Sequence, residues 1–111
     1  MTRTVKPITD KAEVSIDFPD KTYVGSFTRH SGFEAEADAE GVALKLVRAG
    51  EDRRVVEMHI HHYLFADILE ELACAIEARP AIDEAHRGPL MDAARHLARA
   101  LGRHGRTPAR R

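Results

Sequence analysis

The chain has 111 residues, of which 43% are hydrophobic and 32% charged, with a formal net charge of -1 and a single cysteine. This length fits one domain, and it lets the chain bury roughly two thirds of the surface that the unfolded chain exposes. One cysteine excludes a disulfide framework, and no run approaches the ~20 apolar residues of a membrane span. The N-terminus also lacks the apolar core of a signal peptide. We therefore expect a soluble cytoplasmic protein, and the abundance of alanine and arginine suggests a bacterial source.

Alternating apolar and polar residues, which are typical of half-buried strands, occur five times before residue 61. The segments between them carry turn residues and are too short for a crossover helix, so we predict a five-stranded antiparallel meander. Its strands span about residues 13–18, 22–28, 33–39, 42–48 and 54–60.

Turn residues also predict how the strands pair. A turn at residues 20–21 would pair Phe18 with Tyr23, and a turn around His30, with Gly32 at positive φ, would bring the second strand beside the third.

In the second half of the sheet, a two-residue turn at Glu40-Gly41 would pair Ala35 with Leu46. A loop over residues 49–53 would pair Leu46 with Val56. Both hairpins then place the same set of apolar residues on one face.

Two helices are predicted after the strands, over residues 62–79 and 89–101. The first has apolar residues at helical spacing and ends at Pro80, while the second begins at Gly88-Pro89 and stops at Gly102. We expect both helices to pack on one face of the sheet, which makes residues 1–102 a single α+β domain. Residues 103–111 should form a flexible basic tail.

Charge is distributed unevenly along the chain. Residues 1–94 carry eleven basic and eighteen acidic side chains, whereas residues 95–111 carry six arginines and no acid. An arginine stripe on the second helix, continued in the tail, could neutralise nucleic-acid phosphates. The alternative is a solvated helix face and a tail that pairs with an acidic surface of the same or a neighbouring subunit. The arginines are Arg95, Arg99, Arg103, Arg106, Arg110 and Arg111.

The predicted outer face of the sheet argues against nucleic acid, because it is acidic. Glu34, Glu36, Asp38 and Glu57 lie on it and would repel a nucleic-acid backbone. Val24, Val47 and Val55 form an apolar patch on the same face, where we expect a contact between the two chains of a dimer.

The stretch VVEMHIHHYLF contains three histidines, His59, His61 and His62. In the predicted register His59 and His61 project from the outer face roughly 7 Å apart, close enough to share a zinc-like ion. Asp38 or Glu40 would supply a third ligand. The alternative is a pair of exposed strand-end residues at a strand-to-helix junction, with His62 starting the helix. A divalent-metal site is therefore one hypothesis, and no other cofactor is expected.

No pattern in the chain indicates catalysis. The serines lie in no triad context, and the sequence has neither a glycine-rich phosphate loop nor a Cys-x-x-Cys pair. We therefore predict a non-enzymatic protein that acts by protein-protein interaction or homo-oligomeric scaffolding, with a dimer as the expected assembly. Nucleic-acid binding is the first alternative, and metal binding is the second.

The stretch VALKLVRAGEDRRVVEMHIHHYLFADILEELACAI runs from strands directly into a helix. Together with the strands before it, this order is similar in outline to the strand-strand-strand-strand-helix units of Pur-alpha-like single-strand-binding proteins. The resemblance implies nucleic-acid binding, but the acidic sheet face predicted here differs from the basic, aromatic face of those proteins.

Overall fold

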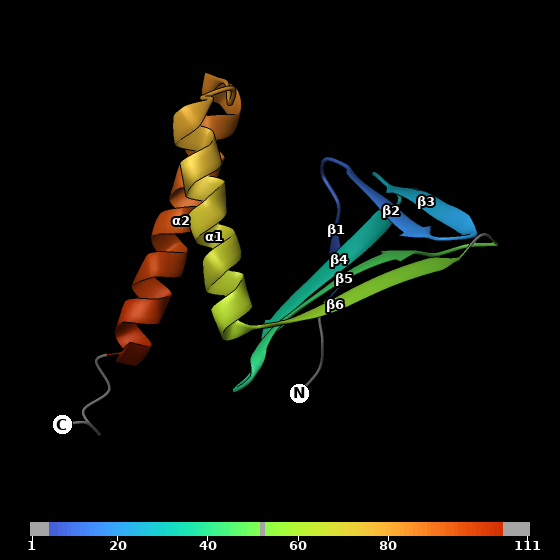
Figure 1. The fold of residues 1–111 in the computed structure, drawn as a ribbon, viewed down its shortest axis with the longest axis horizontal. Coiled ribbons are helices and arrows are strands. Elements are labelled where there is room, and N and C mark those ends of the chain that lie inside the picture. Colours follow the sequence, from blue (N-terminus) through green and yellow to red (C-terminus); the bar gives the residue numbers. More distant parts are fainter. Residues whose placement is uncertain (1–4, 52, 106–111) are drawn as a thin grey trace. The chain divides into compact units, whose positions relative to one another are not determined.

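The structure is a computed structural model that describes residues 5–51 and 53–105. Within these ranges six strands precede two helices, which confirms the predicted α+β class (Figure 1). The strands are β1 (Lys6–Pro7), β2 (Ala12–Phe18), β3 (Lys21–Phe27), β4 (Ser31–Ala37), β5 (Gly41–Arg48) and β6 (Arg54–His61), and the helices are α1 (His62–Ala78) and α2 (Glu84–Gly105).

The chain divides into two compact units, Met1–Leu69 and Glu70–Arg111, with the boundary inside α1. The packing of the helices on the sheet and the single domain over residues 1–102 therefore stay predictions. Neither described helix is both long and apolar enough to cross a membrane.

The predicted five-stranded meander is wrong, because the strands form two antiparallel sheets. One has the strand order β1-β4-β5-β6, and the other is the hairpin β2-β3. The edge of β4 that β3 was expected to occupy is taken by β1, where Lys6 pairs with Phe33. A Cβ atom on Gly32 would lie 2.5 Å from Cγ1 of Val5, so glycine permits this close approach. Gly32 does not adopt the positive φ that the predicted turn needs.

Strands β4, β5 and β6 do form a meander. The β5-β6 register is confirmed, with Leu46 opposite Val56. The β4-β5 turn closes earlier than predicted, so Ala35 pairs with Leu44 instead of Leu46. Because side chains alternate with a period of two, this shift by two residues leaves each side chain on its predicted face.

The β2-β3 hairpin shows the same kind of shift. Phe18 pairs with Lys21 rather than with Tyr23, so the turn lies at residues 19–20. Proline is well suited to the first central position of a turn, which favours Pro19-Asp20 over Asp20-Lys21.

The buried core described in this structure is small. Phe27 at the end of β3 is 1% exposed, and Ile8 after β1 is 8% exposed; no other hydrophobic residue is buried in the described ranges. Arg54 of β6 donates a 3.3 Å hydrogen bond from Nη1 to the carbonyl oxygen of Val24, which ties the hairpin to the larger sheet.

Burial on the large sheet also differs from the simple two-face prediction. Glu34, expected on the solvated face, is only 8% exposed, whereas Phe33 and Met58 are 36% and 52% exposed. The registers place Lys45 opposite Glu34 on one side and opposite Glu57 on the other, so these three charged residues form one row across β4, β5 and β6.

Helix α1 follows the prediction closely, but α2 begins at Glu84 rather than at Pro89. The reason is a helix cap at Asp83, whose Oδ1 accepts a 3.1 Å hydrogen bond from the backbone N–H of His86. An aspartate at the N-cap accepts a hydrogen bond from a backbone N–H group that has no partner within the helix, so it stabilises a helix that starts directly after it. Pro89 therefore lies inside the helix.

The end of α2 also lies beyond its predicted position. Gly102 does not stop the helix, which continues to Gly105. Glycine ends a helix efficiently when it adopts positive φ, and Gly102 does not. Residues 103–105 are thus helical rather than part of a tail, and residues 106–111 lie outside the described residues.

Replacing Phe27 with alanine should lower the free energy of unfolding by about 3–5 kcal/mol, because it removes the most buried large side chain among the described residues. Urea unfolding followed by the fluorescence of Tyr23 and Tyr63 measures this change. Val24→Ala, on the same strand but 69% exposed, should cost about 0.5 kcal/mol or less. Equal losses in the two variants would be incompatible with Phe27 as the centre of this core.

Candidate functional site

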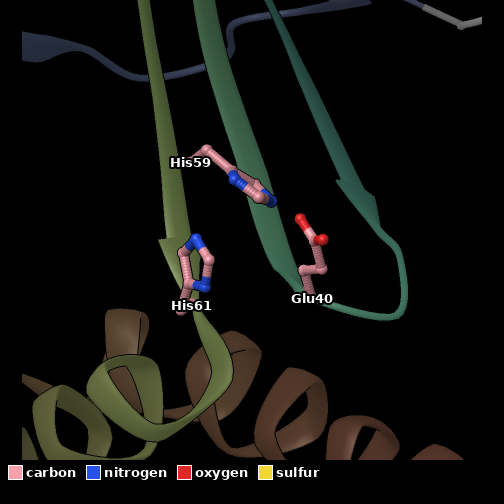
Figure 2. Close-up of side chains that lie close together, drawn as sticks. All are labelled: Glu40, His59 and His61. Atoms are coloured by element: carbon pink, nitrogen blue, oxygen red, sulfur yellow. The ribbon is translucent and has the colours of Figure 1, made fainter.

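The end of β6 and the turn before β5 bring three potential ligands together. The β5-β6 register places Gly41 opposite His61 and Ala43 opposite His59, so Glu40, next to Gly41, lies beside both histidines. One ligand atom from each of Glu40, His59 and His61 lies within 4.8 Å of the other two. Figure 2 shows the Glu40 carboxylate pointing toward the imidazole of His59, with His61 below it on β6.

Asp38 fixes the turn that carries Glu40. Its Oδ1 accepts hydrogen bonds from the backbone N–H groups of Glu40 (2.8 Å) and Gly41 (3.0 Å). The backbone N–H of Asp38 also donates to the carbonyl oxygen of Gly41 at 2.9 Å. These bonds hold the backbone of Glu40 in one place beside β6.

Gly41 allows this turn to lie close to β6. A Cβ atom at this position would overlap the carbonyl oxygen of Ile60 and would lie 2.8 Å from Cα of His61. Any other residue would have to push the start of β5 away from the two histidines. The approach of Glu40 to His59 and His61 therefore depends on glycine at position 41.

His62 belongs to the frame of the site and not to the group of ligands. Its backbone N–H donates to the carbonyl oxygen of Glu40 at 3.2 Å, and its ring Nε2–H donates to the carbonyl oxygen of Asp38 at 3.0 Å. His62 is also the first residue of α1, as the sequence predicted. This residue joins the turn, the end of β6 and the start of the helix.

Asp38 lies beside the three ligands without joining them. Its Oδ1 is 3.7 Å from Nε2 of His59. The backbone hydrogen bonds from Glu40 and Gly41, and then the charge of His59, lower the pKa of Asp38 below its ordinary value. Asp38 thus remains a carboxylate that faces His59, while Glu40 is the carboxylate that the structure groups with both imidazoles.

The site offers two imidazole nitrogens and one carboxylate oxygen on an exposed surface. The rings of His59 and His61 lie 5.0 Å apart between centroids, with an angle of 59° between their planes. Nitrogen and oxygen donors of this kind suit zinc and similar divalent ions. Of the four residues that the sequence predicts as metal ligands, Glu40, His59 and His61 come together. The fourth, Asp38, positions the turn that carries Glu40.

The predicted arginine stripe is only partly described. Arg95, Arg99 and Arg103 are exposed on α2 and follow one another at steps of four, so they share one face of the helix. Arg106, Arg110 and Arg111 lie outside the described residues. Nucleic-acid binding by these arginines stays a prediction.

Val55 lies near both other valines of the patch that the sequence predicts on the outer face. Val47 and Val55 are cross-strand neighbours, as predicted. Val55 also lines a hollow with Val24 and Arg54, between the β2-β3 hairpin and β6. A dimer contact at this patch stays a prediction.

Each helix also carries a stripe of apolar side chains, which we call the α1 stripe and the α2 stripe; all of them are exposed except Phe65, which is half-buried. The apolar spacing of these helices predicts that they pack on the sheet. No side chain of α1 is buried. The α1 stripe comprises Leu64, Phe65, Ile68, Leu69, Leu72 and Ile76, and the α2 stripe comprises Leu90, Ala94, Leu97 and Leu101.

Comparisons with models of protein families, with curated proteins and with solved structures found no match for this chain. The resemblance to Pur-alpha-like proteins therefore stays a similarity in the order of elements. A function can be inferred only from the chain's own residues.

Changing Asp38 to asparagine should reduce the dependence of stability on acid pH. A carboxyl group whose pKa is lowered by folding stabilises the folded state above its unfolded pKa of about 3.9, and this stabilisation is lost as the pH falls through the lower folded pKa. Asparagine keeps the Oδ1 acceptor for the turn but does not titrate.

Urea midpoints measured between about pH 5 and about pH 2 test this expectation. The wild type should lose more stability over this range than Asp38→Asn. Asp67→Asn, at an exposed position on α1, is the control and should change the profile less. Identical profiles for the wild type and Asp38→Asn would show that the lowered pKa does not contribute to stability.

Proposed function

We propose that this protein acts by self-association, in which the helices of two copies pack together. The observation that supports the proposal is the exposure of the α1 stripe. In the single chain, Leu64 and Leu72 are 55% and 53% exposed, and Ile68 and Ile76 are 36% and 45% exposed. An amphipathic helix with no buried side chain lacks the packing that normally stabilises helices in proteins.

Burial of the α1 stripe and the α2 stripe would contribute a large free energy for a chain of this size. Complete burial of one leucine or isoleucine side chain contributes about 1.5–3 kcal/mol relative to exposure. The α2 stripe adds Leu90, Leu97 and Leu101, which are 55%, 39% and 63% exposed. Contiguous apolar patches of this kind usually mark interaction sites on soluble proteins.

The spacing of the two stripes favours a second copy of the chain as the partner. In α1, Phe65, Leu69, Leu72 and Ile76 follow one another at steps of four, three and four, and Leu90, Ala94, Leu97 and Leu101 repeat these steps in α2. This spacing is the one with which helices pack at shallow crossing angles in bundles. Each chain would thus supply two matching stripes to one bundle.

The size of the stripes fits such an interface. The 17 residues of α1 and the 22 residues of α2 make helices about 25 Å and about 33 Å long. At a helix width of about 10 Å, their footprint is roughly 600 Å² per chain. A standard interface buries about 800 Å² of accessible surface per partner. A two-fold dimer would bury this surface symmetrically in a four-helix bundle.

The wild type should therefore elute as a dimer of about 25 kDa, twice the chain mass of 12.4 kDa, in size-exclusion chromatography with light scattering. Leu72→Glu and Leu97→Glu should shift it toward the monomer, because each places a charge inside the bundle. Glu70→Gln and Arg99→Gln lie on the polar faces of the same helices and should remain dimeric.

A wild type that is monomeric at high micromolar concentration would contradict self-association. It would instead favour the packing of both stripes on the chain's own sheet, as the sequence predicted. Circular dichroism of the glutamate variants separates loss of association from loss of the helices.

A second candidate function is nucleic-acid binding by the arginines of α2. It is supported by their position, because Arg95, Arg99 and Arg103 lie on the face of α2 opposite Leu90, Leu97 and Leu101. Self-association through the apolar stripes would therefore leave these arginines accessible. A dimer would present two such faces.

Titration with single- and double-stranded DNA at two salt concentrations tests this candidate. Arg95→Gln and Arg99→Gln should each weaken binding for all sequences and reduce the salt slope by about one. Arg87→Gln is the control, since Arg87 is paired with Glu84 at 2.7 Å in the first turn of α2. Absence of salt-dependent binding at micromolar protein would remove this candidate.

A further inference from the structure

The group formed by Glu40, His59 and His61 has the donors of a transition-metal site. A tetrahedral ion with bonds of about 2.1 Å holds its ligand atoms about 3.4 Å apart. The three ligand atoms lie within 4.8 Å of one another, and all three residues are exposed. Because the side chains of Glu40, His59 and His61 are exposed, they can rotate to bring their ligand atoms from at most 4.8 Å apart to about 3.4 Å apart.

We propose that Glu40, His59 and His61 bind one divalent transition-metal ion, with zinc as the best match. The neighbouring backbone is already in place, so binding requires no rearrangement of strands. The paired strands β5 and β6 hold His59 and His61, and the hydrogen bonds of Asp38 and His62 hold the turn that carries Glu40. Ligands on a rigid frame lose less conformational entropy on binding.

Asp38 completes the site as a positioning residue. In metal sites, a ligating histidine usually donates its second ring N–H to a carboxylate or carbonyl oxygen, which fixes the orientation of the ring. The carboxylate of Asp38 lies 3.7 Å from Nε2 of His59 and is held in place by two backbone N–H groups. It can therefore orient His59 without itself binding the ion.

The donor set defines the class of ion and leaves room for another ligand. Imidazole nitrogens favour zinc, copper, nickel or cobalt over magnesium and calcium, which prefer oxygen donors. Three protein ligands on an exposed surface leave a fourth position for water or a small anion. The bound ion would link the β4-β5 turn to the end of β6, where α1 begins.

The test uses full-length protein without a histidine tag, freed of metal by a chelator. Titration calorimetry with zinc, and the visible absorption of bound cobalt, should show one ion per chain. Zinc should also raise the melting temperature, because it binds the folded state. Magnesium should neither bind in the calorimeter nor raise the melting temperature. This readout is independent of self-association, since none of the three ligands lies on the α1 or α2 stripe.

Variants assign the binding to these residues. Glu40→Gln, His59→Gln and His61→Gln should each weaken zinc binding roughly tenfold or more, and Asp38→Asn, which keeps the turn, should weaken it about 10–100-fold. His96→Gln, an exposed histidine on α2, is the matched control and should bind like the wild type. Undiminished binding in the three ligand variants, or an equal loss in His96→Gln, would overturn the proposal. So would the absence of zinc binding by the wild type.

Discussion

The turn between β4 and β5 is the constraint on which the arrangement of the large sheet and of its histidine edge depends. The Asp38 carboxylate closes this turn on the backbone N–H groups of Glu40 and Gly41. Gly41, having no side chain, lets β5 begin against the carbonyl of Ile60. Together these two residues set the register of β4 and bring Glu40 beside His59. A local hydrogen-bond pattern therefore determines which carboxylate faces which imidazole.

A second constraint is the small amount of apolar surface that the described chain buries. Only Phe27 and Ile8 are buried hydrophobic residues in the described ranges, while leucines and isoleucines on both helices are a third or more exposed. Hydrophobic burial is the main favourable term in folding. Exposed stripes of this size would therefore be stabilised by packing against another apolar surface. This requirement links the stability of the helices to the proposed self-association. The arginines of α2 and the histidine edge lie outside those stripes, so neither has to be buried when the helices associate.

The histidine edge could be predicted as a set of residues but not as a geometry. The alternation along β6 places His59 and His61 on one side, and the nearest acids are Asp38 and Glu40, which lie just before the neighbouring strand β5. Which acid joins the two histidines depends on where the turn closes, because a closure at residues 40–41 would shift the pairing of β4 with β5 by two residues from the observed register. Two residues correspond to roughly 7 Å along a strand, which exceeds the tolerance of a coordination site. His62, which the sequence places at the start of the helix, makes hydrogen bonds to the turn and is therefore part of the frame of the site.

The amino-acid sequence by itself determined the features that arise from neighbouring residues. These are the five longer strands with their alternating faces, the β5-β6 register and the first helix, because side-chain periodicity and turn chemistry act over a few residues. Only the tertiary structure decided which strands share a sheet. The pairing of β1 with β4 joins segments far apart in the chain, and it depends on the close fit of Val5 against Gly32. The structure also decided that α2 begins after Asp83 and not at Pro89, because the carboxylate of Asp83 accepts a hydrogen bond from the first turn of the helix.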